Sequence, residues 1–324
     1  MRTSLVLAAV TLLVVGVAVI AVAGGQGPAA TTPAMSSSPR PFLVAHRGAS
    51  GYAPEHTLAS YRLALEQGAN YVEQDLTLSK DGVLMCLHDD TLERTTDVED
   101  RFPDRAVVEP GPGGQPTRRW YANDFTLAEL KTLDAGAWFD ARFAGERMPT
   151  FEEAIALVKG KAGLFPELKS PARLNARGVD VEQSVKDALT RHGLVGGTVK
   201  GHAAVYLQSF EEKSVRRLAT LLPTVPRTLL IGGPDAARWL SEAGLKEART
   251  FATAIGPARQ LLEARPALIA EAQALGLAVV PYTFRVVRGG DAAARDAARA
   301  DMRRFLVDLR VDGLFTDNPD LFPR

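Results

Sequence analysis

The sequence predicts an α/β protein and, within that class, a (β/α)8 barrel, the TIM barrel. Short apolar runs alternate with amphipathic, helix-like stretches over most of the chain after residue 40, and this alternation is typical of a parallel sheet covered by helices. Six of the apolar runs lead directly into polar residues, as at His46 and His88. Functional groups at the C-terminal ends of many strands are the layout of a barrel active site.

A doubly wound sheet is the alternative α/β architecture. It gathers its ligand groups at one switch point and carries a Gly-rich first turn. Neither a G-x-G-x-x-G pattern nor a P-loop pattern occurs in the chain. The barrel is therefore the better prediction.

Nine strand candidates are present where a barrel needs eight. They lie at 42–45, 71–78, 83–87, 163–165, 204–207, 228–232, 252–256, 277–284 and 313–316. We expect the second and third to be neighbouring barrel strands. The connection LSKDG between them is too short for a helix, so the barrel is predicted to be irregular there.

Helices are predicted between these runs. Several begin after Thr, Asp or Pro and end at Gly, which fits the preferences for helix caps. They lie at 56–68, 150–160, 180–193, 211–222, 266–276 and 301–310. Residues 97–148 interrupt the alternation with many charges and several Pro and Gly residues. They predict an insertion over the barrel mouth, rather than part of a core, that shapes access to the site.

The N-terminus predicts export of the rest of the chain. Arg2 precedes an uncharged, mostly apolar run from Ser4 to Ala23. Ala21-Val22-Ala23 suits cleavage of a signal peptide, whereas the length of the run suits an uncleaved membrane anchor. Residues 24–40 are rich in Gly, Pro and Ser and predict a flexible linker. The folded domain is therefore expected at 41–324, outside the cell or in its envelope, with membrane contact only through residues 4–23 if they are retained.

The bulk composition excludes two further readings. The chain has 38 basic and 38 acidic residues, so no excess positive charge favours a nucleic-acid partner. Cys86 is the single cysteine, so no intramolecular disulfide forms. It lies in an apolar run and is predicted to be a small buried hydrophobic residue.

Acidic side chains form the first chemical feature. Glu73 and Asp75 stand two apart on a predicted strand and therefore share a face, and Glu167 follows another strand. Carboxylates without thiolates favour a hard cation, Ca²⁺ or Mg²⁺, which would relieve their repulsion. Alternatively, Glu73 and Asp75 line a solvated hairpin face.

Basic side chains complete the predicted site. His46 and His88 each end an apolar run, and Arg47 and Lys169 follow candidate groups by one or two residues. Two cations beside a metal and two imidazoles suit a tetrahedral anion. Phosphoryl transfer needs these parts, namely charge neutralisation, a base and an acid.

One long stretch resembles a known family. It reads AHRGASGYAPEHTLASYRLALEQGANYVEQDLTLSKDGVLMCLHDDTLERTTDVEDRFPDR. It resembles the glycerophosphodiester phosphodiesterase family, and is most similar to exported, periplasmic-type members through PEHT and DVxDRFPDR. Further matches at DFTLAELKTL, PELK, VYLQSF, PYTFR and GLFTDNPD extend the resemblance over roughly 41–322.

The resemblance implies roles for individual residues. It makes Glu73, Asp75 and Glu167 the ligands of one divalent cation, Ca²⁺ rather than Mg²⁺, and His46 and His88 the acid–base pair. Arg47 and Lys169 would contact phosphate, Glu55 would have a supporting polar role, and Gln208 and Tyr282 would line the mouth. His56 replaces the Asn common in other members and is left out of the catalytic set. Phe284 stands where a Trp is often found, which weakens the assignment of glycerol contacts.

The implied reaction is hydrolysis of a glycerophosphodiester to sn-glycerol 3-phosphate and an alcohol through a cyclic phosphate. His46 is expected to act first as base and His88 as acid. Phospholipase C- or D-like action on intact lipids is an alternative, but the insertion has only scattered apolar residues for lipid contact. A binding protein without activity is a third reading, and the intact set of core residues argues against it.

Overall fold

The computed structural model describes residues 41–286, 288 and 290–324. The predicted export segment at 1–23 and the linker at 24–40 lie outside the described residues. None of the helices in the described part of the chain combines the length and the apolar character needed to cross a membrane.

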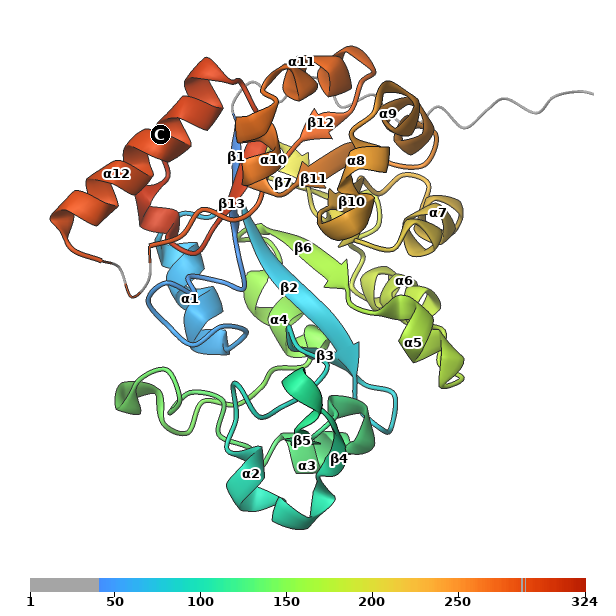
Figure 1. The fold of residues 1–324 in the computed structure, drawn as a ribbon, viewed down its shortest axis with the longest axis vertical. Helices are drawn as coiled ribbons and strands as arrows, with labels where there is room; N and C mark the ends of the chain where they lie inside the picture. The colour runs from blue at the N-terminus through green and yellow to red at the C-terminus, as the bar shows by residue number, and fades with distance from the viewer. Residues whose placement is uncertain (1–40, 287, 289) are drawn as a thin grey trace, which may run out of the picture. The chain divides into compact units, whose positions relative to one another are not determined.

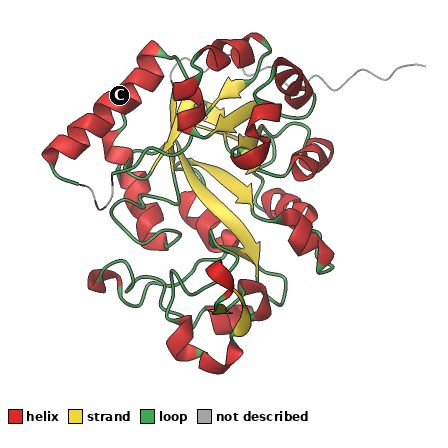
Figure 2. Cartoon of the chain, viewed as in Figure 1, coloured by secondary structure: helices red, strands yellow, loops and turns green. Residues whose placement is uncertain are grey.

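Eight parallel strands form a barrel, which confirms the predicted fold (Figures 1 and 2). Their order in the sheet is β12-β11-β10-β9-β6-β2-β1-β13. The two ends of this order meet after β12, where Phe315 donates its amide to Pro281 O at 3.0 Å and Phe284 bridges Thr316. The strands are β1 (Phe42–Ala45), β2 (Tyr71–Leu78), β6 (Gly163–Leu168), β9 (Leu207–Ser209), β10 (Arg227–Ile231), β11 (Ala254–Pro257), β12 (Ala278–Val279) and β13 (Gly313–Thr316).

Helices surround these strands (Figure 2). They are α1 (Leu58–Glu66), α4 (Phe151–Val158), α5 (Pro171–Ala176), α6 (Val181–Arg191), α7 (Glu212–Leu221), α8 (Ala236–Trp239), α9 (Glu242–Arg249), α10 (Arg259–Ala264), α11 (Ala267–Ala274) and α12 (Ala292–Arg303). The predicted caps are confirmed at α1, α4 and α6. There the side chains of Thr57, Thr150 and Asp180 each accept a hydrogen bond from the amide of the third helical residue, which satisfies one of the free N–H groups at a helix start.

The last helix begins well before the predicted residue 301. Asp291 caps α12 by accepting a hydrogen bond from the amide of Ala294 at 2.8 Å, and a π-helical turn over Arg304–Asp308 continues the helix. Met302 is the one buried residue of α12. The sequence prediction missed most of this helix, and also α9, because alanines and charges give no wide apolar stripe.

The expectation that the run at 83–87 is a barrel strand is wrong. Residues Leu84–Cys86 form β3, which pairs antiparallel with β2, with Leu76 opposite Cys86 and Leu78 opposite Leu84. The physical reason is the short connection, since a parallel partner needs a crossover of a dozen or more residues. The connection turns at Gly82, whose φ is +81° and which donates its amide to Ser79 O. The ninth strand candidate thus lies outside the barrel.

The insertion has a core of its own, so the expectation that it contributes none is wrong. It contains α2 (Val98–Arg101), the hairpin of β4 (Val107–Pro110) and β5 (Pro116–Arg119), and α3 (Leu127–Leu130). Its buried cluster includes Trp120 and Phe125 and draws Met85 and Leu87 from the β3 segment. It packs at the C-terminal end of β2 (Figure 1), where Asn123 Nδ2 donates to Leu78 O at 2.6 Å.

Aromatic rings fill the barrel below the C-terminal ends of the strands. Phe165 and Tyr206 stack at 5.0 Å, and Tyr71 meets both rings edge to face. Alternate residues of a strand share a face, so Glu73 and Asp75 point into the barrel from the same face of β2 as Tyr71. The aromatic layer forms the floor, and the two carboxylates lie above it.

Candidate active site

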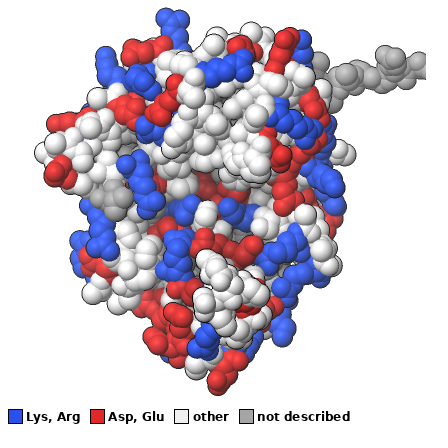
Figure 3. Space-filling model, viewed as in Figure 1, with Lys and Arg blue, Asp and Glu red and all other residues white. Residues whose placement is uncertain are grey.

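A cavity of about 410 Å³ lies at the C-terminal ends of the barrel strands. Figure 3 shows this hollow, with acidic side chains lying between basic ones. It is lined by His46, Arg47, Glu73, Asp75, His88, Glu167, Lys169, Gln208, Phe210, Leu230, Ala258, Gln260, Tyr282, Thr283, Arg285, Phe315 and Asp317. The structure therefore brings all but one of the predicted site residues into one cavity. Glu55 is the exception.

Three buried carboxylates form one wall of the cavity. Glu73 and Asp75 are neighbours on the inner face of β2, and Glu167 on β6 is the register partner of Asp75. Burial and the charge of Asp75 raise the pKa of Glu73 well above its usual range, and the same causes raise the pKa of Glu167 to about 8. Burial opposes ionisation of Asp75 too, but Lys169, His56 and Arg47 hold its pKa well below the usual range.

Two cationic side chains lie against these carboxylates. Lys169 Nζ is 3.1 Å from Glu167 Oε1 and 3.9 Å from Asp75 Oδ1. Arg47 donates its backbone amide to Glu73 Oε2 at 2.7 Å, and its Nε lies 3.4 Å from Asp75 Oδ2. Burial disfavours both charges, yet the carboxylates raise the pKa of each group. Both side chains therefore stay cationic beside the cavity.

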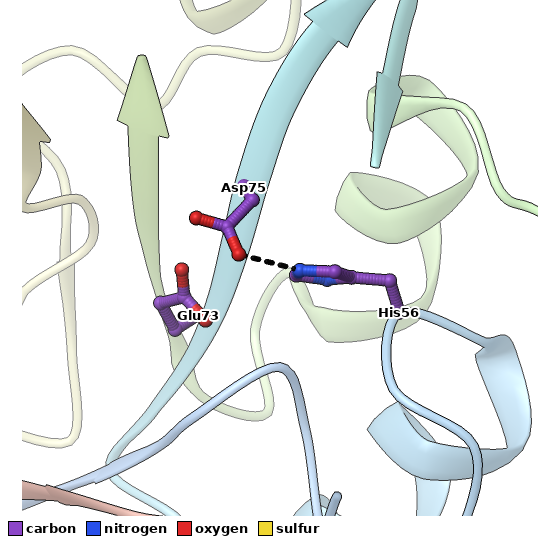
Figure 4. Close-up of side chains that lie close together, drawn as sticks. All are labelled: His56, Glu73 and Asp75. Atoms are coloured by element: carbon purple, nitrogen blue, oxygen red, sulfur yellow. Dashed lines mark hydrogen bonds and ion pairs between the residues drawn. The ribbon is translucent and has the colours of Figure 1, made fainter. Parts of the chain in front are cut away.

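The carboxylates fit a divalent cation. One ligand atom each of His56, Glu73 and Asp75 lies within 4.8 Å of the others. Figure 4 shows Glu73 and Asp75 side by side on β2, with the ring of His56 reaching Asp75. Glu167 adjoins Asp75 through the register of β2 and β6. A set of hard oxygen donors with buried, mutually repelling charges is the chemistry that Ca²⁺ or Mg²⁺ satisfies. The alternative of a solvated hairpin face is wrong, because all three carboxylates are buried.

The two predicted acid–base histidines come from different elements, and both line the cavity. His46 follows β1, and its Nδ1 donates to Asp317 Oδ1 at 2.7 Å. His88 follows β3, and its Nδ1 donates to Asp89 Oδ1 at 2.6 Å. In each ring Nδ1 is engaged by a carboxylate, which leaves Nε2 available for chemistry in the cavity.

Glu55 lies behind Arg47 instead of in the cavity. Its Oε1 accepts from Arg47 Nη1 at 2.9 Å, and both of its oxygens accept from the guanidinium of Arg94 at 2.7 and 2.9 Å. Although burial alone would raise it, these cations lower the pKa of Glu55 to about 2. The predicted supporting role thus corresponds to contacts with arginines, not with the cavity.

The far wall of the cavity is more apolar. The rings of Phe210 and Tyr282 meet edge to face at 5.8 Å, and the Tyr282 hydroxyl donates to Ile231 O at 3.2 Å. Gln208 donates to Phe165 O at 3.4 Å, while its Oε1 is buried without a hydrogen-bond partner in the described part of the protein. Phe284, which stands where the family often has Trp, packs on Phe305 at 4.9 Å and is not among the residues that line the cavity.

Comparisons with known proteins identify the family to which the chain belongs. The profile of the Glycerophosphoryl diester phosphodiesterase family matches residues 46–321. The chain is 33% identical to the glycerophosphodiester phosphodiesterase of Bacillus subtilis (strain 168) over 294 residues, which cover 88% of this chain and 86% of that protein. The chain belongs to this family. It is an enzyme, a glycerophosphodiester phosphodiesterase, and its substrates are small glycerophosphodiesters.

Further relatives agree with the family assignment. A probable glycerophosphodiester phosphodiesterase 1 of Mycobacterium tuberculosis (strain H37Rv) is 33% identical over 247 residues, covering 74% of this chain and 80% of that one. The solved phosphodiesterase of Agrobacterium tumefaciens matches with a TM-score of 0.63 and 29% identity, covering 87% and 98% of the two chains. A phosphodiesterase of Oleispira antarctica, solved with the product sn-glycerol-3-phosphate, matches with a TM-score of 0.66 and 26% identity, covering 87% and 94%.

Several residues in or beside the cavity were not predicted from the sequence, among them Asp317, Phe210, Arg94 and His56. Asp317 directly follows a strand, so the rule that located His46 could have located it too, whereas Phe210 is apolar and lies outside that rule. Arg94 lies in a loop among other charges and gave no local signal. His56 was excluded because it departs from the usual residue, yet its Nε2 lies 2.9 Å from Asp75 Oδ2.

Proposed function

We propose that the enzyme hydrolyses glycerophosphodiesters to sn-glycerol 3-phosphate and an alcohol in a cation-dependent reaction, with His46 and His88 as the acid–base pair. One observation carries this proposal: two imidazoles, four carboxylates and three cationic side chains line a single cavity. The cavity volume of about 410 Å³ suits a small polar substrate.

Arg47 and Lys169 would bind the phosphate oxygens. Both lie beside the carboxylate wall and line the cavity. A guanidinium contributes two parallel donors and an ammonium contributes a point charge, and phosphate accepts from both. These contacts would fix the phosphorus between the two histidines.

Glu73, Asp75 and Glu167 would hold the divalent cation. When bound, the ion would neutralise charge on the phosphate oxygens as a Lewis acid. We propose Ca²⁺ over Mg²⁺, because Ca²⁺ accepts irregular sets of oxygen ligands more readily.

The histidines would move the protons of two successive steps. His46 accepts the proton of the glycerol hydroxyl next to the phosphoester, and that oxygen bonds to phosphorus while the bond to the alcohol breaks. His88 protonates the departing alcohol oxygen. In the second step, His88 accepts a proton from water and the water oxygen bonds to phosphorus. His46 then returns its proton to the glycerol oxygen as the cyclic phosphate opens.

Turnover of glycerophosphocholine by the full chain tests this proposal. Chelation should abolish release of glycerol phosphate, and Ca²⁺ should restore it better than Mg²⁺. His46→Ala and His88→Ala should each lower kcat by at least ~10², while His202→Ala, at a side chain that does not line the cavity, should leave it unchanged. If both site variants kept near-normal turnover with intact cation binding, the acid–base assignment would fail. Faster turnover of phosphatidylcholine than of glycerophosphocholine would favour a phospholipase instead.

We also propose that the chain is exported, with residues 4–23 as signal peptide or anchor and residues 41–324 as the catalytic domain. The support is the apolar N-terminal run followed by a Gly-, Pro- and Ser-rich stretch. If the chain stays anchored, protease added to intact cells of the producing organism should degrade the domain. If the segment is cleaved, the domain should be found in the medium. The N-terminal sequence of the recovered protein then decides between cleavage and retention. A protease-resistant, intracellular domain would overturn this proposal.

A further inference from the structure

Two residues of the loop between β1 and α1 adopt a left-handed backbone, and both reach the same carboxylate oxygen. The φ angles of Arg47 and His56 are +55° and +52°. Arg47 Nε lies 3.4 Å and His56 Nε2 lies 2.9 Å from Asp75 Oδ2. Non-glycine residues adopt this conformation at a cost, and such strain concentrates at functional sites. The loop geometry therefore serves the position of Asp75.

Hydrogen bonds fix the orientation of the His56 ring. Its side chain is 3% exposed. Nδ1 lies 2.9 Å from the hydroxyl of Tyr61, which is also fully buried. A carboxylate oxygen accepts hydrogen bonds, so Nε2 carries a proton and donates it to Asp75 Oδ2 at 2.9 Å. With that proton on Nε2, Nδ1 can accept from the tyrosine hydroxyl, so hydrogen bonds engage both ring nitrogens.

The ring lies behind the cavity instead of facing it. Among the described residues, those lining the catalytic cavity include Glu73, Asp75 and Glu167 but not His56. His56 instead borders a void of about 10 Å³ behind the site, together with Glu55 and Cys86. Asp75 Oδ1, the oxygen that His56 does not touch, is the one near Lys169 at 3.9 Å. Asp75 thus has one oxygen held from behind and one available toward the cavity.

We propose that His56 is a positioning residue for the cation site: it holds Oδ2 of Asp75, so that Oδ1 alone faces the ion. This inference rests on the proposed function, in which Asp75 is a cation ligand. Direct ligation by His56 would need a nitrogen lone pair aimed at the ion. The Nδ1 lone pair is used by Tyr61, and Nε2 bears the proton given to Asp75. Figure 4 shows the hydrogen bond from the ring of His56 to Asp75.

Calorimetric titration of the purified full chain with Ca²⁺ and, separately, Zn²⁺ tests this role. Loss of a residue that orients a ligand typically costs roughly 10–100-fold in metal affinity, so His56→Ala should raise the Kd for Ca²⁺ by that factor. His56→Gln, whose amide nitrogen can occupy the place of Nε2, should stay within a few-fold of wild type. Tyr61→Phe should show a smaller loss than His56→Ala. His202→Ala is the matched control and should bind Ca²⁺ as wild type does.

The possible outcomes separate the proposals. An unchanged Kd for Ca²⁺ in His56→Ala overturns the positioning role while leaving the cation site intact. If the His56 variants keep Ca²⁺ binding but lose Zn²⁺ binding, the positioning role is also overturned. Zn²⁺ prefers nitrogen ligands, so that result would indicate direct ligation by His56. A wild-type chain that binds neither ion overturns the proposed cation dependence itself. Thermal unfolding in the presence of chelator shows whether His56→Ala folds, and His56→Gln and Tyr61→Phe decide the question if it does not.

Discussion

The Nδ1 atom of His46 lies 2.7 Å from Oδ1 of Asp317, and the other oxygen of Asp317 lies 2.9 Å from Nε of Arg285. The carboxylate is 3% exposed whereas Arg285 is 62% exposed. Asp317 therefore holds Nδ1 of the imidazole and leaves Nε2 available for chemistry in the cavity that both residues line. It would also stabilise the positive charge that His46 gains when it accepts a proton.

Asp317→Asn should lower kcat by roughly 10²-fold, because the amide keeps the shape of the side chain but not its charge. Cation affinity should not change, since Asp317 contacts none of the three carboxylates proposed as ligands. Steady-state kinetics together with calorimetry measures the two quantities. Asp320→Asn, which alters a neighbouring carboxylate paired with Tyr52, is the control. Equal effects of the two substitutions would show that Asp317 acts only on stability.

Arg94 connects the two sides of the site, because it contacts Asp89 beside His88 and Glu55 beside Arg47. Arg94→Ala should lower kcat/KM by roughly 10–100-fold through misplacement of both groups. Arg94→Lys should recover little, since an ammonium cannot reproduce the bidentate contact with Glu55. Arg105→Ala removes a comparable ion pair, with Glu129, elsewhere in the insertion. Similar losses in Arg94→Ala and Arg105→Ala would rule out a specific role for Arg94.

The sequence was sufficient to predict the positions of those site residues that depend on a single strand. Alternation along β2 placed Glu73 and Asp75 on one face, and the ends of apolar runs located His46 and Glu167. His88 was located correctly although its strand was misassigned, because the end of the hairpin strand β3 also reaches the cavity. The barrel followed from the same rule, since a parallel sheet gathers the C-terminal ends of its strands.

The remaining features depend on tertiary contacts that no local pattern carries. Glu55 pairs with Arg47, which is 8 positions away in the sequence, and with Arg94, which is 39 positions away. His56 gains its contact with Asp75 through a left-handed backbone, which residue type alone does not predict. The core of the insertion combines apolar residues scattered among charges, and only folding onto β3 gathers them around Trp120.

Trp120 should be essential for the stability of the insertion. It is fully buried in the insertion cluster, and its Nε1 donates to Phe102 O at 2.8 Å. Trp120→Ala should lower the free energy of unfolding by about 3–5 kcal/mol, as measured by denaturant titration. Trp138→Ala, at a side chain that is 39% exposed, should cost much less. If both substitutions destabilised the chain equally, the insertion would lack the core described above.

Cys86 should be unreactive in the native enzyme. Burial raises the pKa of its thiol to about 12, so the thiolate is absent at neutral pH and a thiol reagent cannot reach the sulfur. Ellman's reagent should therefore label the chain only in denaturant. Rapid labelling of the folded chain at pH 8 would contradict the observed burial.

The raised pKa of Cys86 also makes the free energy of unfolding fall at alkaline pH. Because the folded thiol ionises near pH 12 and the unfolded thiol near 9, only the unfolded state loses this proton between the two values. The contribution to stability is complete below pH 9 and is lost as the pH rises toward 12. Between pH 8 and 10 this one group should lower the free energy of unfolding by about 1.4 kcal/mol. Cys86→Ala should lack that increment, so its loss of stability between pH 8 and 10 should be smaller than that of wild type by this amount. Identical losses in the two proteins would place the alkaline sensitivity elsewhere, on groups such as the buried tyrosines.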